Sequence, residues 1–110
     1  MKRSLIFPYS PPFAEEQALR FWCQKYRRRL PRIYITRNIQ TVVRSLKDDI
    51  AWYDPDYRSI FLSERFFKLE IDQRILVLFH EATHSRGIQS EKKCDRMAGY
   101  DFLQMRIPSR

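Results

Sequence analysis

Apolar residues recur at helical spacing in three segments of the chain. The first covers residues 13–29, where apolar positions share one face, and Pro31 ends this helix. The second covers residues 72–84, which contain no Pro or Gly and predict a largely buried helix. The third covers residues 91–104 and follows Gly87, which can end the preceding helix with a positive φ. The expected inward face of the first helix is Ala14, Ala18, Phe21, Trp22 and Cys23, and the expected N-caps of the other two are Asp72 and Ser90.

Alternating apolar and polar residues predict strands between the first two helices. Residues 32–36 alternate in this way, and residues 50–53 and 59–63 flank a Pro-Asp turn, which predicts a hairpin. Residues 38–46 fit either a strand or a short helix, and the prolines near the start predict an extended arm. We therefore expect an α+β fold in which residues 1–110 form one compact domain. A small three-stranded, mainly antiparallel sheet would pack on about three helices.

Both histidines of the chain lie in one motif within the buried helix, His80-Glu81-Ala82-Thr83-His84. Helix positions i and i+4 share a face, so the two imidazoles of this H-E-x-x-H motif can bind one zinc ion. Glu81 is offset by one position and can take a proton from a water that the zinc activates. The alternative is an ordinary core helix with two hydrogen-bonded histidines. Without a metal, however, such a buried cluster must satisfy several polar groups in an apolar setting.

A catalytic zinc ion needs three protein ligands and an open position for water, and the chain has no third histidine. Glu91 and Asp95 lie one turn apart on the third predicted helix, on the same face as Ala98 and Phe102. We predict Glu91 as the third ligand, with Asp95 accepting a hydrogen bond from the spare ring N–H of one histidine. Cys94 and Asp95 are the alternative ligands. Glu91 could also be only an acid that complements the helix dipole.

These residues resemble the site of the gluzincin metallopeptidases, in which a glutamate completes the H-E-x-x-H motif. The chain is most similar to the minigluzincins, which are soluble proteins of about this length related to catalytic domains of integral membrane metallopeptidases. Three segments carry the likeness and read like the family's hairpin, active-site helix and glutamate helix. They are residues 51–63 (AWYDPDYRSIFLS), 72–84 (DQRILVLFHEATH) and 91–103 (EKKCDRMAGYDFL).

The resemblance implies a zinc-dependent peptidase in which Glu81 passes a proton to the leaving amine. In the family an edge strand pairs with the extended substrate, and a C-terminal segment lies in the cleft of zymogen-like members. Residues 105–110 would be such a latency tail, unless they are only a frayed terminus. The residues that match the substrate-binding edge strand are Ile60, Phe61, Leu62 and Ser63.

The chain offers few walls for a cleft, because only six residues separate His84 from Glu91. We therefore expect a shallow cleft that takes peptides or flexible protein chains rather than folded proteins. The developing oxyanion also needs a donor besides the zinc. The candidates are several arginines and Tyr53, Tyr57 and Tyr100, of which Tyr100 lies about opposite Glu91 on a helical wheel.

Positive charge gathers at the end of the first predicted helix, in a chain of net charge +8. Cations there favour the helix dipole, and arginine-rich faces are often only solvated. Such a cluster can also attract phosphate or acidic partners. The alternative function is therefore a basic nucleic-acid- or protein-binding module with a structural or vestigial zinc site. The cluster consists of Arg20, Lys25, Arg27, Arg28, Arg29 and Arg32.

No run of apolar residues is long enough to cross a membrane, and the apolar stretch after the basic start is too short for a signal peptide. We therefore expect a cytoplasmic protein. Cys23 and Cys94 are the only cysteines and lie on different predicted helices. In an intracellular chain we expect them to be buried thiols rather than a disulfide.

Overall fold

The computed structural model describes residues 5–37 and 50–106. In these ranges the chain forms four strands, three α-helices and one short 3₁₀ helix, so the predicted α+β single domain with three helices is confirmed. Residues 38–46, which fitted either a strand or a helix, lie outside the described ranges. The elements are β1 (Leu5–Pro8), α1 (Phe13–Tyr26), β2 (Arg32–Arg37), β3 (Ala51–Asp54), β4 (Ser59–Leu62), η2 (Glu64–Lys68), α3 (Ile71–His84) and α4 (Glu91–Arg106).

The described strands form one mixed sheet in the order β1-β2-β4-β3. The predicted hairpin is present as β3 and β4, which pair antiparallel. The prediction of three mainly antiparallel strands was wrong in two respects, because β1 adds a fourth strand antiparallel to β2, and β2 pairs parallel with β4. Pro8 is the last residue of β1, which is an edge strand. Proline has no backbone N–H, and an edge strand does not need that N–H for hydrogen bonds to a second neighbour. The predicted extended arm is thus part of the sheet.

β4 lies inside the sheet, which corrects the prediction of an edge strand there. It pairs with β2 on one side and β3 on the other, so its backbone groups are already used within the sheet. A strand paired on both sides has no free edge for another chain. Among the described strands, β1 and β3 form the two edges. The residues that were predicted to form a substrate-binding edge are Ile60, Phe61 and Leu62 of β4 and Ser63, which directly follows it.

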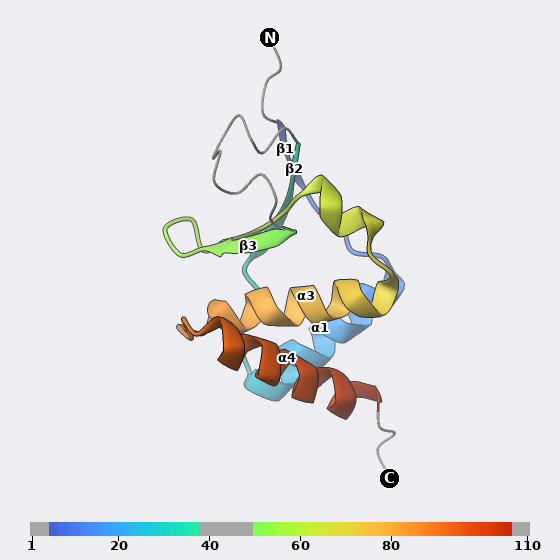
Figure 1. Ribbon diagram of the computed structural model, residues 1–110, viewed down its shortest axis with the longest axis vertical. Coiled ribbons are helices and arrows are strands. Elements are labelled where there is room, and N and C mark those ends of the chain that lie inside the picture. The colour runs from blue at the N-terminus through green and yellow to red at the C-terminus, as the bar shows by residue number, and fades with distance from the viewer. Residues whose placement is uncertain (1–4, 38–49, 107–110) are drawn as a thin grey trace.

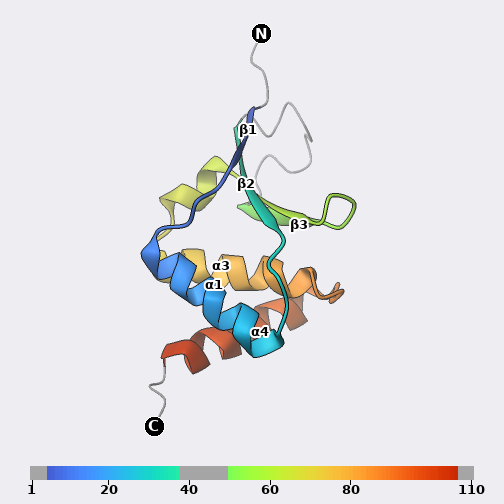
Figure 2. The ribbon, with the colours of Figure 1, turned by 180° about the vertical axis from the view of Figure 1, so that it is seen from behind.

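α3 is the central element of the molecule. Figures 1 and 2 show it beneath β3, with α1 and α4 packed on its other side. Phe79 of α3 packs with Trp22 of α1 in one apolar cluster, while Leu78 packs with Ile60 of the sheet in a second. All four side chains are completely buried. Burial on two sides confirms the predicted buried helix and holds its remaining face at one defined orientation.

The ends of the helices follow local backbone chemistry. α1 ends at Tyr26 rather than at the predicted Arg29, because Arg27 adopts a left-handed conformation with φ 52° and its N–H bonds to Cys23 O. Of the predicted basic cluster, Arg20 and Lys25 therefore lie on α1, whereas residues 27–29 lie in the connection after it. α3 begins at Ile71, with Glu70 rather than Asp72 at the N-cap position.

The connection between α3 and α4 agrees with the prediction. Gly87 has a φ of 89°, a conformation that residues with a Cβ rarely adopt. Ser90 Oγ accepts a hydrogen bond from the N–H of Lys93 at 3.1 Å, which is the geometry of an N-cap. These two residues reverse the chain between His84 and Glu91.

Two buried residues of α1, Glu15 and Leu19, were not among the predicted inward-facing positions. Glu15 is fully buried, whereas Ala14, which was expected to face inward, is exposed. Tyr9 donates a hydrogen bond to Glu15 Oε1, and Arg74 Nη1 lies 3.8 Å from Glu15 Oε2. Burial, and then the hydrogen bond to Glu15, raises the pKa of Tyr9 above its usual range. These contacts connect the start of α1 to α3.

Candidate metal centre

The two histidines of α3 present their imidazoles to the same point. His80 and His84 lie one helical turn apart, with ring centroids separated by 4.8 Å. Their Nε2 atoms are 3.1 Å apart, and each side chain is 16% exposed. The predicted pairing of the motif on one helix face is therefore present in the structure.

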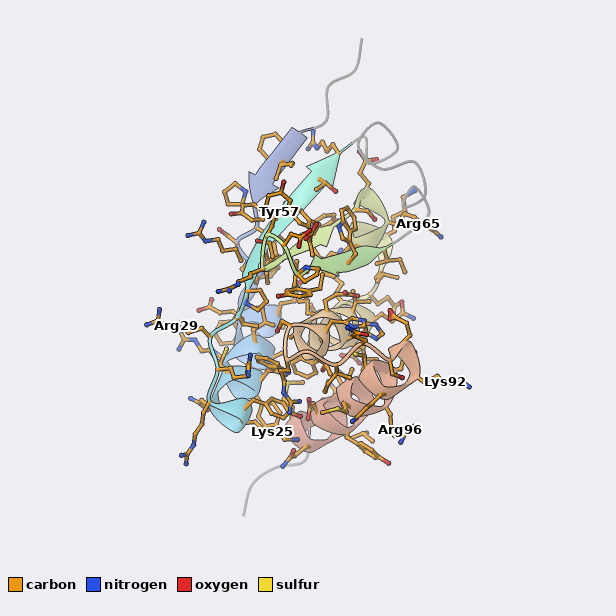
Figure 3. All side chains as sticks on the ribbon, turned by 90° about the vertical axis from the view of Figure 1, so that its left-hand side faces the viewer. Lys25, Arg29, Tyr57, Arg65, Lys92 and Arg96 are labelled. Carbon is orange, nitrogen blue, oxygen red and sulfur yellow. The ribbon has the colours of Figure 1, made fainter. Side chains whose placement is uncertain are left out.

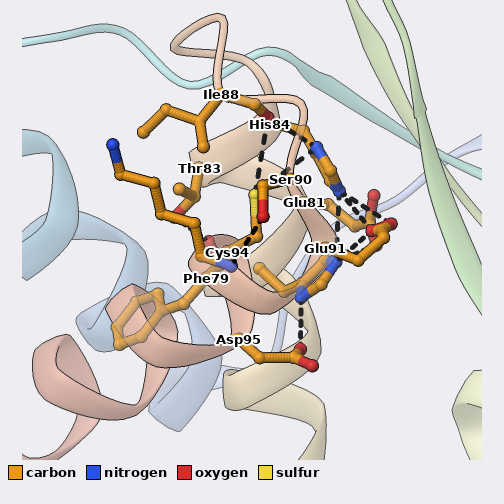
Figure 4. Close-up of polar contacts among 11 residues, drawn as sticks. Phe79, Glu81, Thr83, His84, Ile88, Ser90, Glu91, Cys94 and Asp95 are labelled. Carbon is orange, nitrogen blue, oxygen red and sulfur yellow. Dashed lines mark hydrogen bonds and ion pairs between the residues drawn. The ribbon is translucent and has the colours of Figure 1, made fainter.

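Outer hydrogen bonds hold both rings in a defined orientation (Figure 4). His80 Nδ1 lies 2.6 Å from Asp95 Oδ1, and His84 Nδ1 lies 2.8 Å from the carbonyl oxygen of Ile88. Since a carboxylate and a carbonyl can only accept, both Nδ1 atoms donate. A neutral imidazole then carries its lone pair on Nε2. Both histidines thus direct an electron-pair donor at their meeting point.

Glu91 of α4 brings a carboxylate to this point. Its Oε2 atom lies 2.8 Å from Nε2 of His84 and 3.1 Å from Nε2 of His80. Burial raises the pKa of Glu91, but hydrogen bonds to His84 and His80 and their charges together outweigh it and leave the pKa below its ordinary value. Glu91 reaches the histidines from the solvent side, with 70% of its side chain exposed, rather than pointing inward as expected.

The spacing of these three donors fits a small metal ion. Zinc binds nitrogen and oxygen ligands at about 2.0–2.2 Å, which places tetrahedral donors about 3.3 Å apart. The observed separations are between 2.8 and 3.1 Å. Two imidazoles and one carboxylate are also a ligand set that leaves a fourth position open. The residues present therefore fit the ion.

Cys94 is a second candidate for the third donor. The ligand atoms of His80, His84 and Cys94 lie within 4.8 Å of one another, so this group could hold a metal ion. However, Cys94 Sγ lies 3.4 Å from Nδ1 of His84, on the opposite edge of the ring from Nε2. Burial, and then the charge of Glu91, raises the pKa of the thiol to about 11. An ion held between the two Nε2 atoms would therefore lie on the side of Glu91.

Glu81 lies beside the meeting point rather than in it. Its carboxylate Oε2 is 3.9 Å from Nε2 of His80, and the residue is only 7% exposed. This position agrees with the single-residue offset within the motif. The carboxylate can reach a water near the three donors without occupying a ligand position.

A cleft of about 610 Å³ opens over the centre, between α3 and the edge strand β3. Tyr53 lines it, whereas Tyr57 lines a neighbouring cavity and Tyr100 is 63% exposed on α4 outside both. Of the walls that come from β3, the sequence singled out only Tyr53, because the others depend on the order of strands in the sheet. These walls are Ala51, Trp52, Tyr53 and the adjoining Pro55.

The predicted latency tail begins within α4, because residues 105 and 106 belong to that helix. Arg106 Nη1 lies 3.5 Å from Asp72 in the first turn of α3, at the opposite end of that helix from His84. Residues 107–110 lie outside the described ranges, so the latency tail stays a prediction.

The remaining cysteine prediction is consistent with the structure. Cys23 and Cys94 are both free thiols, Cys94 fully buried and Cys23 half-buried. Among the helices of the described ranges, none is long and apolar enough to cross a membrane.

Comparisons with models of known protein families, with curated proteins and with solved structures find no match to this chain.

Proposed function

We propose that the protein is a zinc-dependent metallopeptidase of the gluzincin type, as its resemblance to the minigluzincins implies. The proposed zinc ligands are His80, His84 and Glu91. The observation that supports this best is the convergence of two imidazole nitrogens and one carboxylate within 3.1 Å, with Glu81 buried beside them. A helix that serves only as part of the hydrophobic core does not need this arrangement.

The chemistry divides between the ion and the side chains around it. Zinc in this position would act as a Lewis acid and lower the pKa of a water molecule toward neutrality. Glu81 accepts the proton of that water as its oxygen attacks the peptide carbonyl carbon. Glu81 then delivers the proton to the amine nitrogen as the C–N bond breaks. Asp95 keeps His80 in the tautomer that presents Nε2.

Tyr53 is the proposed second donor to the developing oxyanion. It is the only one of the three predicted tyrosines in the wall of the metal cleft. Its hydroxyl can donate a hydrogen bond as negative charge develops on the carbonyl oxygen.

The proposed substrate is an extended segment of a peptide or a flexible protein chain. β3 borders the cleft, and β4 is its one partner among the described strands. Its outer edge can pair with the main chain of an extended peptide, which binds with little dependence on sequence. In this proposal β3 takes the role that the family resemblance implies for residues 60–63.

The test is cleavage of an unstructured protein such as casein by the zinc-loaded wild type and by Glu81→Gln. Loss of the proton acceptor should lower kcat by about 10²- to 10⁴-fold. Zinc content should stay at one ion per chain, because Glu81 is not a ligand. Glu64→Gln, an exposed acid at the start of η2, is the matched control and should cleave like the wild type.

A second candidate function is a basic binding module with a structural zinc site. The observation that favours it is a cavity lined by four arginines next to the metal cleft. The same experiment separates the two candidates, because a structural site has no use for a proton acceptor beside the ion. Failure of both the wild type and Glu81→Gln to cleave, with one zinc bound to each, contradicts the peptidase proposal.

A further inference from the structure

A second cavity, of about 500 Å³, opens beside the metal cleft and carries a concentrated positive charge. We call it the arginine pocket and define it by Arg28, Arg29, Arg32 and Arg58, which line it. The first three come from the connection after α1 and the start of β2, and Arg58 comes from the β3–β4 turn. The strand register pairs Arg32 with Ser59 and so brings the two segments together. Figure 3 shows Arg29 extending from this side of the molecule.

No acidic side chain of the described residues forms an ion pair with these arginines. In the described part of the chain, none of the four guanidinium groups makes an ion pair, whereas Arg20, Arg74 and Arg106 elsewhere each lie against a carboxylate. The acids of the neighbouring turn do not line the pocket, and Asp54 accepts hydrogen bonds from the backbone instead. Four like charges around one hollow repel one another, and an anion placed among them would relieve this repulsion.

The arginine pocket continues the metal cleft. Tyr53 forms part of the wall of both cavities, and Ser85, which also lines the arginine pocket, directly follows the candidate ligand His84. β3 runs along the metal cleft and ends at the turn that carries Arg58. An extended chain that lies along β3 over the metal centre would therefore reach the arginine pocket within a few residues.

We infer that the arginine pocket is a substrate subsite, and that the preferred substrates carry acidic side chains a few residues from the bond that is cleaved. This inference rests on the proposed peptidase function and adds the class of substrate to it.

The charges of the two cavities differ, which favours such a peptide over a nucleic acid. Glu81, Glu91 and Asp95 line the metal cleft, so a uniform polyanion along both cavities would meet like charge. A peptide with acidic residues at one end alone fits both.

The inference is tested by binding without cleavage, in a Glu81→Gln background. The probes are a peptide with an Asp/Glu cluster at one end and its Asn/Gln counterpart, each labelled with an uncharged dye and followed by fluorescence anisotropy. The acidic peptide should bind more tightly, and added salt should weaken this preference. Arg32→Gln/Arg58→Gln should weaken its binding by about three- to tenfold, the range for exposed ion pairs.

The matched control is Lys92→Gln/Arg96→Gln, which removes the same charge from α4 on the other side of the molecule (Figure 3). It should change binding by less than about twofold. Equal weakening by the two double variants would overturn the inference, because net charge alone would then explain the binding. Displacement by a single-stranded oligonucleotide at lower concentration than by the acidic peptide would also overturn it. Failure of the peptidase proposal would instead appear as absent cleavage by the wild type.

Discussion

At the scale of single residues, the hydrogen bonds behind the histidines determine what the centre can bind. Asp95 and the Ile88 carbonyl accept the outer N–H groups, so both Nε2 atoms face Glu91 as electron-pair donors. Three electron-pair donors this close repel one another unless a cation, either a proton or a metal ion, lies among them. The third ligand must therefore lie on the Nε2 side of the His84 ring, where Glu91 lies, and not on the Nδ1 side, where Cys94 lies.

The third ligand can be tested with two substitutions. Loss of a residue that only hydrogen-bonds to a ligand weakens metal binding by about 10- to 100-fold. Glu91→Ala should weaken zinc binding by more than this, because Glu91 is the proposed ligand itself. Cys94→Ala should leave the affinity within about threefold, because its sulfur lies on the Nδ1 edge of His84. Affinity is measured by competition with a chelator. The cobalt-substituted wild type should show no thiolate-to-metal charge-transfer band, and the presence of that band would assign Cys94 as the ligand.

At the scale of elements, the site depends on how α4 is held against α3 and α1. Asp101 of α4 is almost completely buried and accepts hydrogen bonds from Tyr26 at 2.7 Å and Lys25 at 2.6 Å, both on α1. Burial lowers the pKa of Lys25, but the hydrogen bond and charge of Asp101 leave it above its ordinary value. This contact holds in place the helix that carries Glu91.

Removal of the Asp101 carboxylate should therefore destabilise the fold. We expect Asp101→Ala to lower the free energy of unfolding by about 1–3 kcal/mol, less than for a fully buried pair because Lys25 remains partly exposed. Asp72→Ala, which removes an exposed ion pair with Arg106, should change it by less than about 0.5 kcal/mol. Urea unfolding measures both. Equal losses in the two variants would show that burial of Asp101 adds nothing.

At the scale of the whole molecule, a metal ion would connect α3 to α4 and so link binding to folding. Ligands from both helices meet only when the two helices are packed together. An ion that binds the folded chain alone stabilises it by about 2.7 kcal/mol at a concentration 100 times its Kd. For a chain of this size, that corresponds to an increase in Tm of roughly 10 °C or more.

Thermal unfolding with and without zinc checks this link. The wild type and Glu81→Gln should show the same increase in Tm, since Glu81 is not a ligand. His84→Ala should lose most of the increase. A shift that survives this substitution would place the zinc elsewhere on the chain.

The features that the sequence alone determined are those that depend on near neighbours. The spacing of His80 and His84 places both on one face of any helix, and the Gly87 and Ser90 signals reverse the chain before α4. The sequence also predicted that Asp95 accepts a hydrogen bond from one of the histidines, but the packing of α4 on α3 decided that it is His80. Such arguments need only the pitch of a helix and the chemistry of its ends.

Only the tertiary structure decided which strand borders the centre and where the charges gather. The hairpin was evident, but the parallel pairing of β2 with β4 leaves β3, not β4, at the edge. The burial of Glu15 and the meeting of Arg32 with Arg58 also depend on segments far apart in the chain. Side-chain alternation defines the two faces of a strand but not its neighbours. Those neighbours follow from the packing of the whole sheet on α3.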